Sequence, residues 1–198
     1  HALPEDIEKF RGSYARGWDV IREERHQRLQ KLGIIDDTWR LSARDPKVEA
    51  WEELTQGEKE FLEPMMEVYA AMVDRMDQGI GRIIDVLEKN GELDNTLVVY
   101  LQDNGGCAEG YGRASNSDKK DRFAFKPFGP DDLQTKIWPP MQTRDGRWVR
   151  TGPETMPGAE DTFVAYGLGW ANVSNTPFRG YKHDGYEGGI STPFIVHW

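Results

Sequence analysis

The feature that most constrains the fold is a long helical pattern followed by a short apolar run. From Thr55 to Asn90, apolar residues recur at helical spacing for about seven turns. Thr55 and Glu58 match a capping box at the start, and Asn90 with Gly91 indicates the end. Because Pro64 has no backbone N–H, we expect it to kink the helix or to begin a second piece.

The apolar run covers residues 96–101 and is rich in strand-forming side chains. An unbroken apolar run of this length is typical of a strand buried on both faces, as in a parallel sheet. A helix, a tight turn, a buried strand and a polar turn make half of an α/β unit, so α/β is the predicted fold class. Ligands in open α/β sheets gather beyond the carboxyl ends of the strands, where Asp103 and Asn104 follow.

The chain divides into four segments by pattern and composition. Residues 1–57 predict a helical segment and a connection, and residues 58–106 hold the helix, the strand and the polar turn. Residues 107–166 are rich in Gly, Pro and charge without a sustained period, which favours a loop or lid with small strands near Trp148. Residues 167–198 contain a lysine-bearing loop and a final strand. We expect the whole to be an internal fragment of a longer domain.

Composition excludes several classes of protein. With 30% charged and 11% aromatic residues, the chain is globular rather than disordered or fibrous. A formal net charge of −9 argues against nucleic acid or an anionic membrane as the main partner. No apolar run approaches the roughly 20 residues that a membrane span needs. The single cysteine, Cys107, excludes an internal disulfide and a zinc site built from several thiolates.

Asp103 and Asn104 place a carboxylate and an amide oxygen on one tight turn. Gly105 allows the backbone to change direction sharply there. Hard cations such as calcium and magnesium prefer these oxygen ligands. Asp-Asn-Gly is also a common turn sequence, so a purely structural role is the alternative. Two ligands do not fill a shell of six to eight, and a cation here needs further ligands from other segments.

The second candidate cluster is the lysine loop, which we define as residues 174–189. Lys182 is a compact positive charge between glycine-bearing turns and suits an oxyanion such as sulfate or phosphate, or it is a solvated surface lysine. His183 is a candidate for proton transfer or a surface residue, and Glu187 caps a turn or pairs with a cation. Cys107 is a candidate nucleophile, although a small buried residue is the favoured interpretation.

Several stretches then carry a resemblance to a known family. In order they are ALPEDI at 2–7, YAAMVDRMDQGIGR at 69–82, DNTLVVYLQDNG at 94–105, NTPFR with YK at 175–182, and EGGISTP at 187–193. Together they resemble the later part of a sulfatase catalytic domain over nearly the whole chain. The opening stretch is similar to the bacterial arylsulfatase branch of that family.

The resemblance implies an alkaline-phosphatase-like α/β/α sandwich, present here as a partial domain. It also implies a calcium ion and hydrolysis of sulfate esters by a cysteine or serine converted to formylglycine. Asp103 and Asn104 match two metal ligands of the family, and Lys182 matches the catalytic lysine that contacts the sulfate. The implied substrate is a small-molecule or glycan sulfate ester, and the implied location is periplasmic or secreted.

The sequence also departs from the family pattern. The nucleophile motif Cys/Ser-x-Pro/Ala-x-Arg is absent, as are the early aspartate pair and the upstream histidine and lysine, so we expect the chain alone to be inactive. Gln102 stands where serine is usual, and Tyr186 where histidine is frequent. Two alternatives stay open, a phosphohydrolase of the alkaline phosphatase superfamily and a non-catalytic sulfatase-like binding protein. The upstream sequence would distinguish them.

Overall fold

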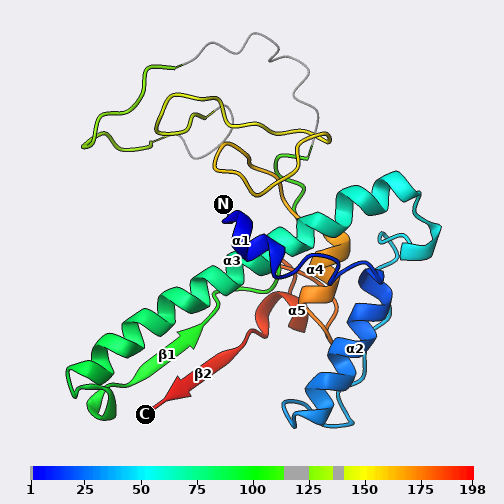
Figure 1. Ribbon diagram of the computed structural model, residues 1–198. Coiled ribbons are helices and arrows are strands. Elements are labelled where there is room, and N and C mark those ends of the chain that lie inside the picture. The colour runs from blue at the N-terminus through cyan, green and yellow to red at the C-terminus, as the bar shows by residue number, and fades with distance from the viewer. Residues whose placement is uncertain (1, 114–124, 136–140) are drawn as a thin grey trace.

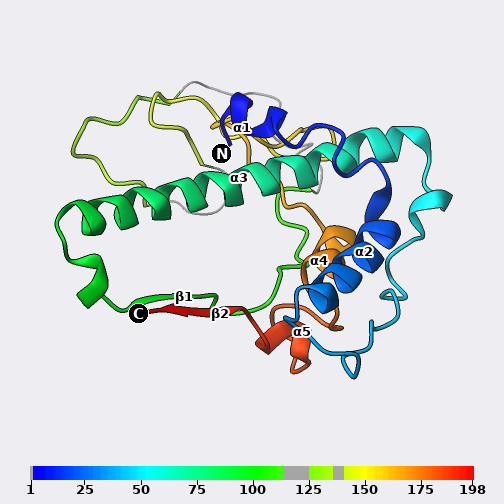
Figure 2. The same ribbon diagram turned by 60° about the horizontal axis from the view of Figure 1, so that its bottom comes forward.

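The computed structural model describes residues 2–113, 125–135 and 141–198 (Figure 1). In both views α3 lies between β1 and β2 on one side and α1 with the long irregular segment, of which residues 125–135 and 141–163 are described, on the other (Figure 2). The helices are α1 (Pro4–Glu8), α2 (Gly17–Lys31), α3 (Gln56–Lys89), α4 (Leu168–Ser174) and α5 (Glu187–Ile190), the 3-10 turns are η1 (Trp51–Glu53) and η2 (Leu93–Asn95), and the strands are β1 (Val98–Leu101) and β2 (Phe194–His197).

Helix α3 begins at the predicted capping box. The Thr55 amide donates to the Glu58 carboxylate at 2.8 Å, and the Glu58 amide donates to the Thr55 hydroxyl at 3.3 Å. The helix continues through Pro64 as one element, so the expected second piece does not form as a separate helix. Proline removes a single backbone hydrogen bond, and the neighbouring Met65 and Met66 are buried in the core, which favours a continuous helix.

The main hydrophobic core is built around tryptophan. Trp170 of α4 has no exposed surface, and its indole N–H donates to the Leu62 carbonyl of α3 at 2.7 Å. Trp18 of α2 and Trp51 of η1 pack against it, with ring centroids 5.6 and 5.5 Å from that of Trp170. These rings hold α2, α3 and α4 together, because each large buried aromatic ring contributes apolar area to the same cluster.

A buried carboxylate fastens α1 to α3. The Asp6 side chain is 1% exposed and accepts from Lys9 at 2.9 Å and from Arg75 of α3 at 2.6 Å. Lys9 also reaches Asp74 of α3 at 2.7 Å. The hydrogen bond from Lys9 lowers the pKa of Asp6, because it stabilises the ionised carboxylate. The N-terminal helix is therefore attached to α3 by charge as well as by packing.

The strands differ from the sequence prediction. β1 pairs with β2 in antiparallel register from Val98 opposite His197 to Leu101 opposite Phe194. The prediction of a parallel sheet with β1 buried on both faces is wrong for the described residues, since β1 alternates half-buried and exposed positions and β2 is exposed throughout. The reason is that a two-stranded sheet buries its side chains only where another layer covers it.

The described elements mix helices with a small sheet, as the α/β class requires, and the finer sandwich stays a prediction. The irregular region contains isolated bridges between Gln142 and Trp148 and between Arg150 and Thr162, close to where small strands were expected. Parts of that predicted loop or lid, residues 114–124 and 136–140, lie outside the described residues. Within the described ranges, no helix combines the length and apolarity needed to cross a bilayer.

Replacing Trp170 by alanine tests the tryptophan core. We expect Trp170→Ala to lower the free energy of unfolding by about 3–5 kcal/mol, because it leaves a large cavity and removes the hydrogen bond to the Leu62 carbonyl. The matched control is Trp39→Ala, since Trp39 is 42% exposed; we expect a loss of about 1 kcal/mol there. Urea unfolding followed by far-UV circular dichroism measures both, and equal losses would contradict this account of the core.

Candidate functional site

The acid–amide turn, residues 103–106, follows β1 after Gln102. Asp103 is exposed, and among the described residues no hydrogen bond or ion pair engages its carboxylate. Asn104 is half-buried, and its side-chain N–H donates to the Gly105 carbonyl at 2.8 Å. That bond uses the amide nitrogen and leaves the amide oxygen as an acceptor. Adjacent residues thus supply a carboxylate and an amide oxygen.

Backbone hydrogen bonds join the acid–amide turn to the lysine loop. The Gly105 amide donates to the Gly189 carbonyl at 2.9 Å, and the Lys182 amide donates to the Gly106 carbonyl at 3.1 Å. Two segments far apart in the sequence therefore lie side by side. The structure brings the loops that carry the predicted metal ligands and the predicted lysine into one cluster.

Asn175 closes this junction from the C-terminal end of α4. Its side-chain oxygen accepts from the Gly106 amide at 2.7 Å, and its side-chain nitrogen donates to the Gly180 carbonyl at 2.9 Å. The residue is 8% exposed, so these bonds are largely shielded from water. Glycine is required at 105, because a Cβ there would lie 1.7 Å from the Gly188 carbonyl oxygen.

Tyr181 anchors the lysine loop next to Lys182. It is 7% exposed, and its hydroxyl donates to the Asp45 carboxylate at 3.0 Å, while its backbone amide donates to the Asp184 carboxylate at 2.9 Å. Burial raises the pKa of the Tyr181 hydroxyl, which keeps it neutral. On the other side of the lysine, His183 has φ +78°, a left-handed conformation that is strained for a residue with a Cβ. Lys182 thus stands between an anchored and a strained residue.

The Lys182 ammonium meets a carboxylate. Its Nζ lies 3.4 Å from Glu109, which also accepts from the Cys107 thiol and the Tyr111 hydroxyl, each at 2.8 Å. Nε2 of His183 lies 3.3 Å from the same carboxyl group. The hydrogen bonds from Cys107 and Tyr111 are the main causes that lower the pKa of Glu109 to about 2. The ion pair in turn raises the pKa of Lys182.

Three other candidates from the sequence receive little support. Burial, followed by the hydrogen bond to Glu109, raises the pKa of the Cys107 thiol, which opposes the thiolate that a nucleophile needs. His183 is exposed and faces Glu109 only through the contact at 3.3 Å. Glu187 is exposed and forms the first residue of α5.

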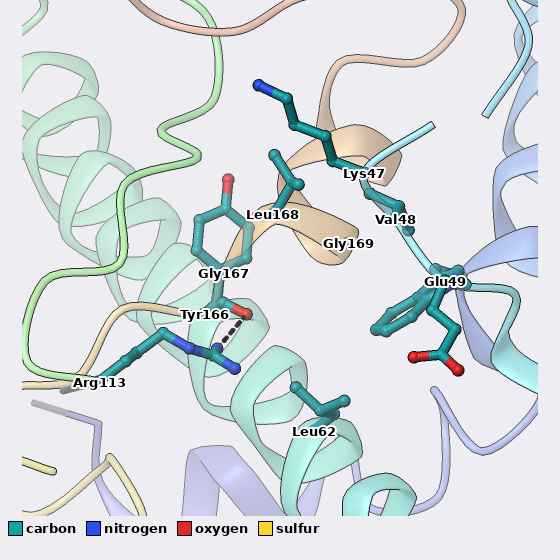
Figure 3. A pocket seen from close by; sticks show the side chains of 10 residues that line it. Lys47, Val48, Glu49, Leu62, Arg113, Tyr166, Gly167, Leu168 and Gly169 are labelled. Atoms are coloured by element: carbon teal, nitrogen blue, oxygen red, sulfur yellow. Dashed lines mark hydrogen bonds between the residues drawn. The ribbon is translucent and has the colours of Figure 1, made fainter. Parts of the chain in front are cut away.

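Two hollows occur near this arrangement. One, of about 160 Å³, is lined by Trp18, Leu62 and Arg113 with residues 47–49 and 166–169, and Arg113 donates to the Tyr166 carbonyl at its edge (Figure 3). The other, of about 350 Å³, lies between residues 40–42 and the lysine loop. Neither hollow has Asp103, Asn104 or Lys182 in its lining.

Asp103 and Asn104 are the type of ligand that calcium binds, but they are too few to complete its coordination shell. Carboxylate and amide oxygens are the ligands that this cation prefers, and Asp103 with Asn104 supplies both. Across the described residues there is no group of three or more His, Cys, Asp or Glu side chains that could hold a metal ion. A calcium ion bound at the acid–amide turn would therefore take its other ligands from elsewhere.

Three residues of the site were not identified from the sequence. Glu109, Asn175 and Tyr181 each make contacts that hold the lysine or the turn in place. A lone carboxylate in a Gly-rich stretch has no signature of its own, and an Asn before Thr-Pro is most simply a turn residue. The available signals are the position of Glu109 shortly after the acid–amide turn and the place of Asn175 and Tyr181 in the NTPFR and YK stretches.

Comparison with known proteins agrees with the motifs. The family model for sulfatases matches residues 1–198, the whole chain. An uncharacterized sulfatase of Schizosaccharomyces pombe is 38% identical over 195 residues, covering 98% of this chain and 31% of the relative. The arylsulfatase of Klebsiella aerogenes is 34% identical over 197 residues, covering 98% of this chain and 36% of the relative.

A shorter match is to an N-acetylglucosamine-6-O-sulfatase of Bacteroides thetaiotaomicron, 52% identical over 40 residues, or 20% of this chain and 7% of that protein. The chain belongs to the sulfatase family. It spans about a third of the length of the two relatives that it matches from end to end.

Gly105→Ala tests the junction between the acid–amide turn and the lysine loop. We expect a loss of about 1–3 kcal/mol in the free energy of unfolding, because the new Cβ would collide with the Gly188 carbonyl. Hydrogen exchange at the Gly106 and Lys182 amides should also become faster. The matched control is Gly110→Ala, where a Cβ meets no atom within 4 Å. Unchanged exchange in Gly105→Ala would show that the junction does not depend on this contact.

Proposed function

We propose that the protein carrying this chain is an arylsulfatase-like sulfuric ester hydrolase, in which this chain supplies part of the site. The observation that carries the proposal is the pair of backbone hydrogen bonds between the acid–amide turn and the lysine loop. They bring the segment with two oxygen ligands beside the segment with an ammonium group. Membership of the sulfatase family supports a sulfate ester as the substrate.

In this proposal Asp103 and Asn104 are calcium ligands. When bound, calcium supplies positive charge that offsets the sulfate oxygens and favours the attacking oxygen. The neighbouring Asn175 and Gly105 hold the turn in place through their bonds to the lysine loop. Groups that are fixed before the substrate binds need no reorganisation when charge develops in the transition state. Electrostatic stabilisation is most effective under that condition.

Lys182 is the substrate-binding and catalytic residue that we assign to the sulfate group. Its ammonium would contact a sulfate oxygen and offset the charge on the group being transferred. The raised pKa of Lys182 keeps the ammonium charged at neutral pH, and the first cause is the hydrogen bond to Glu109. A positive site of this kind is how a chain with net charge −9 would hold an anion.

The nucleophile in this proposal is a formylglycine outside this chain. No Cys/Ser-x-Pro/Ala-x-Arg motif occurs in the sequence, and Cys107 is followed by Ala108 and Glu109 instead. The protonated state that burial favours for Cys107 agrees with a role other than that of nucleophile. Activity therefore requires the part of a sulfatase domain that holds the convertible residue.

Lys182→Met tests the assigned lysine in a protein that carries this chain within a whole sulfatase domain. We expect kcat/KM for an aryl sulfate to fall about 100-fold, because one preorganised charge on the transferred group is lost. The matched control is Lys59→Met on α3, which removes a lysine whose contact is the Glu52 carbonyl. Turnover of the aryl sulfate equal to the control would contradict the assignment, and preferential turnover of an aryl phosphate would favour the phosphohydrolase alternative.

The isolated 198-residue chain provides a second test. We expect no turnover of an aryl sulfate and weak calcium binding, because two protein ligands do not offset the cost of dehydrating the ion. Isothermal titration with calcium should give a small signal that Asp103→Asn abolishes, while Asp131→Asn in the long irregular segment leaves it unchanged. Measured turnover by the isolated chain would refute the placement of the nucleophile elsewhere.

A further inference from the structure

We propose that Glu109 is a built-in counterion for Lys182, which an incoming sulfate group displaces from the ammonium. Glu109 is thus a positioning residue that sets how tightly the site holds an anion. This inference rests on the proposed function, because it assigns the anion to the same lysine. The proposed function assigns roles to the acid–amide turn and to Lys182, and this inference adds a role for Glu109.

The geometry of the carboxylate carries the first step. Glu109 is held by two neutral donors, the Cys107 thiol and the Tyr111 hydroxyl, each at 2.8 Å. Its neighbours on the lysine loop are farther away, with Lys182 at 3.4 Å and His183 at 3.3 Å. The short bonds fix the carboxylate from its own segment, so it keeps its place when the ammonium turns toward another anion. The longer contact to Lys182 is the one that is readily exchanged.

The chemistry of the ammonium carries the second step. Lys182 has three donors on a flexible stem, and its side chain is 35% exposed, so it can reach an anion arriving from solvent. Its backbone stays fixed by the bond to the Gly106 carbonyl. An anion that binds here competes with Glu109 for the same positive charge. Removing the negative charge at Glu109 should therefore tighten anion binding rather than weaken it.

The charged and titratable groups around this ammonium are few in the described part of the chain. Glu109, Cys107 and Tyr111 face it from the segment after the acid–amide turn, and the electrostatic influence of all three on Lys182 raises its pKa. His183 lies beside it on the lysine loop and contacts Glu109. Glu109 is the carboxylate among these groups, and its pKa is lowered to about 2.

The experiment measures the affinity for inorganic sulfate in a protein that carries this chain within a whole sulfatase domain. We expect Glu109→Gln to bind sulfate about fivefold more tightly, the fold-change that corresponds to losing a partly exposed ion pair of about 1 kcal/mol. Glu109→Asp keeps the charge and should stay close to the unmodified protein. Glu8→Gln is the matched control, since Glu8 is the exposed last residue of α1 and forms an ion pair with Arg11.

A double-mutant cycle tests whether Glu109 acts through Lys182. In the Lys182→Met background, Glu109→Gln should leave sulfate affinity unchanged. A second readout is the pKa of Lys182 itself, measured by NMR after ¹³C-methylation of the lysines and assigned by the signal lost in Lys182→Arg. That pKa should fall in Glu109→Gln and stay unchanged in Glu8→Gln. A purely structural role for Glu109 would move neither the cycle nor this pKa.

The outcomes separate this inference from the proposed function. Sulfate binding that depends on Lys182 but is unchanged or weaker in Glu109→Gln overturns the counterion role and leaves the proposed function standing. Sulfate binding that does not depend on Lys182 overturns both, and the NMR measurement then shows whether the ion pair exists without an anion role. A Lys182 pKa that is the same in Glu109→Gln overturns the inference whatever the sulfate affinity.

Discussion

The site depends on one physical constraint, the close approach of two backbone segments that glycine alone permits. Gly105 and Gly106 bond to Gly189 and Lys182, and Asn175 satisfies the remaining amide of Gly106 from inside the protein. A buried backbone group without a partner is costly, so these bonds specify one arrangement of the two loops. The positions of the carboxylate, the amide oxygen and the ammonium follow from it.

Electrostatics at the site are local, and the net charge of the chain does not set them. The formal charge is −9, yet the surroundings of Lys182 in the described part of the chain are set by its ion pair with Glu109. Glu109 has two effects on this lysine. It stabilises the ammonium, because opposite charges raise a lysine pKa, and it occupies that ammonium while no other anion is present. The balance between these effects sets the affinity of the site.

The sequence predicted the parts of this structure whose signals are local. The capping box at Thr55 and the helical period that follows were confirmed, because side-chain spacing determines which face of a helix is buried. The apolar run in β1 predicted burial on both faces, which was wrong here, since strand burial depends on layers that spacing along the strand does not report. Asp103, Asn104 and Lys182 were predicted from motifs. Asn175 lies in the NTPFR motif, but its role and that of Glu109 depend on contacts between distant segments, which a motif does not report.

The tryptophan core and the site are mechanically connected through α4. Trp170 is fully buried in the middle of this helix, and Asn175 lies at its C-terminal cap. A short helix has little stability of its own, so the packing of Trp170 against Trp18 and Trp51 is what fixes its position. Asn175 forms hydrogen bonds with Gly106 in the acid–amide turn and with Gly180 in the lysine loop, which fixes both segments relative to α4. The packed core therefore restricts the motion of the acid–amide turn and the lysine loop, which carry Asp103 and Lys182.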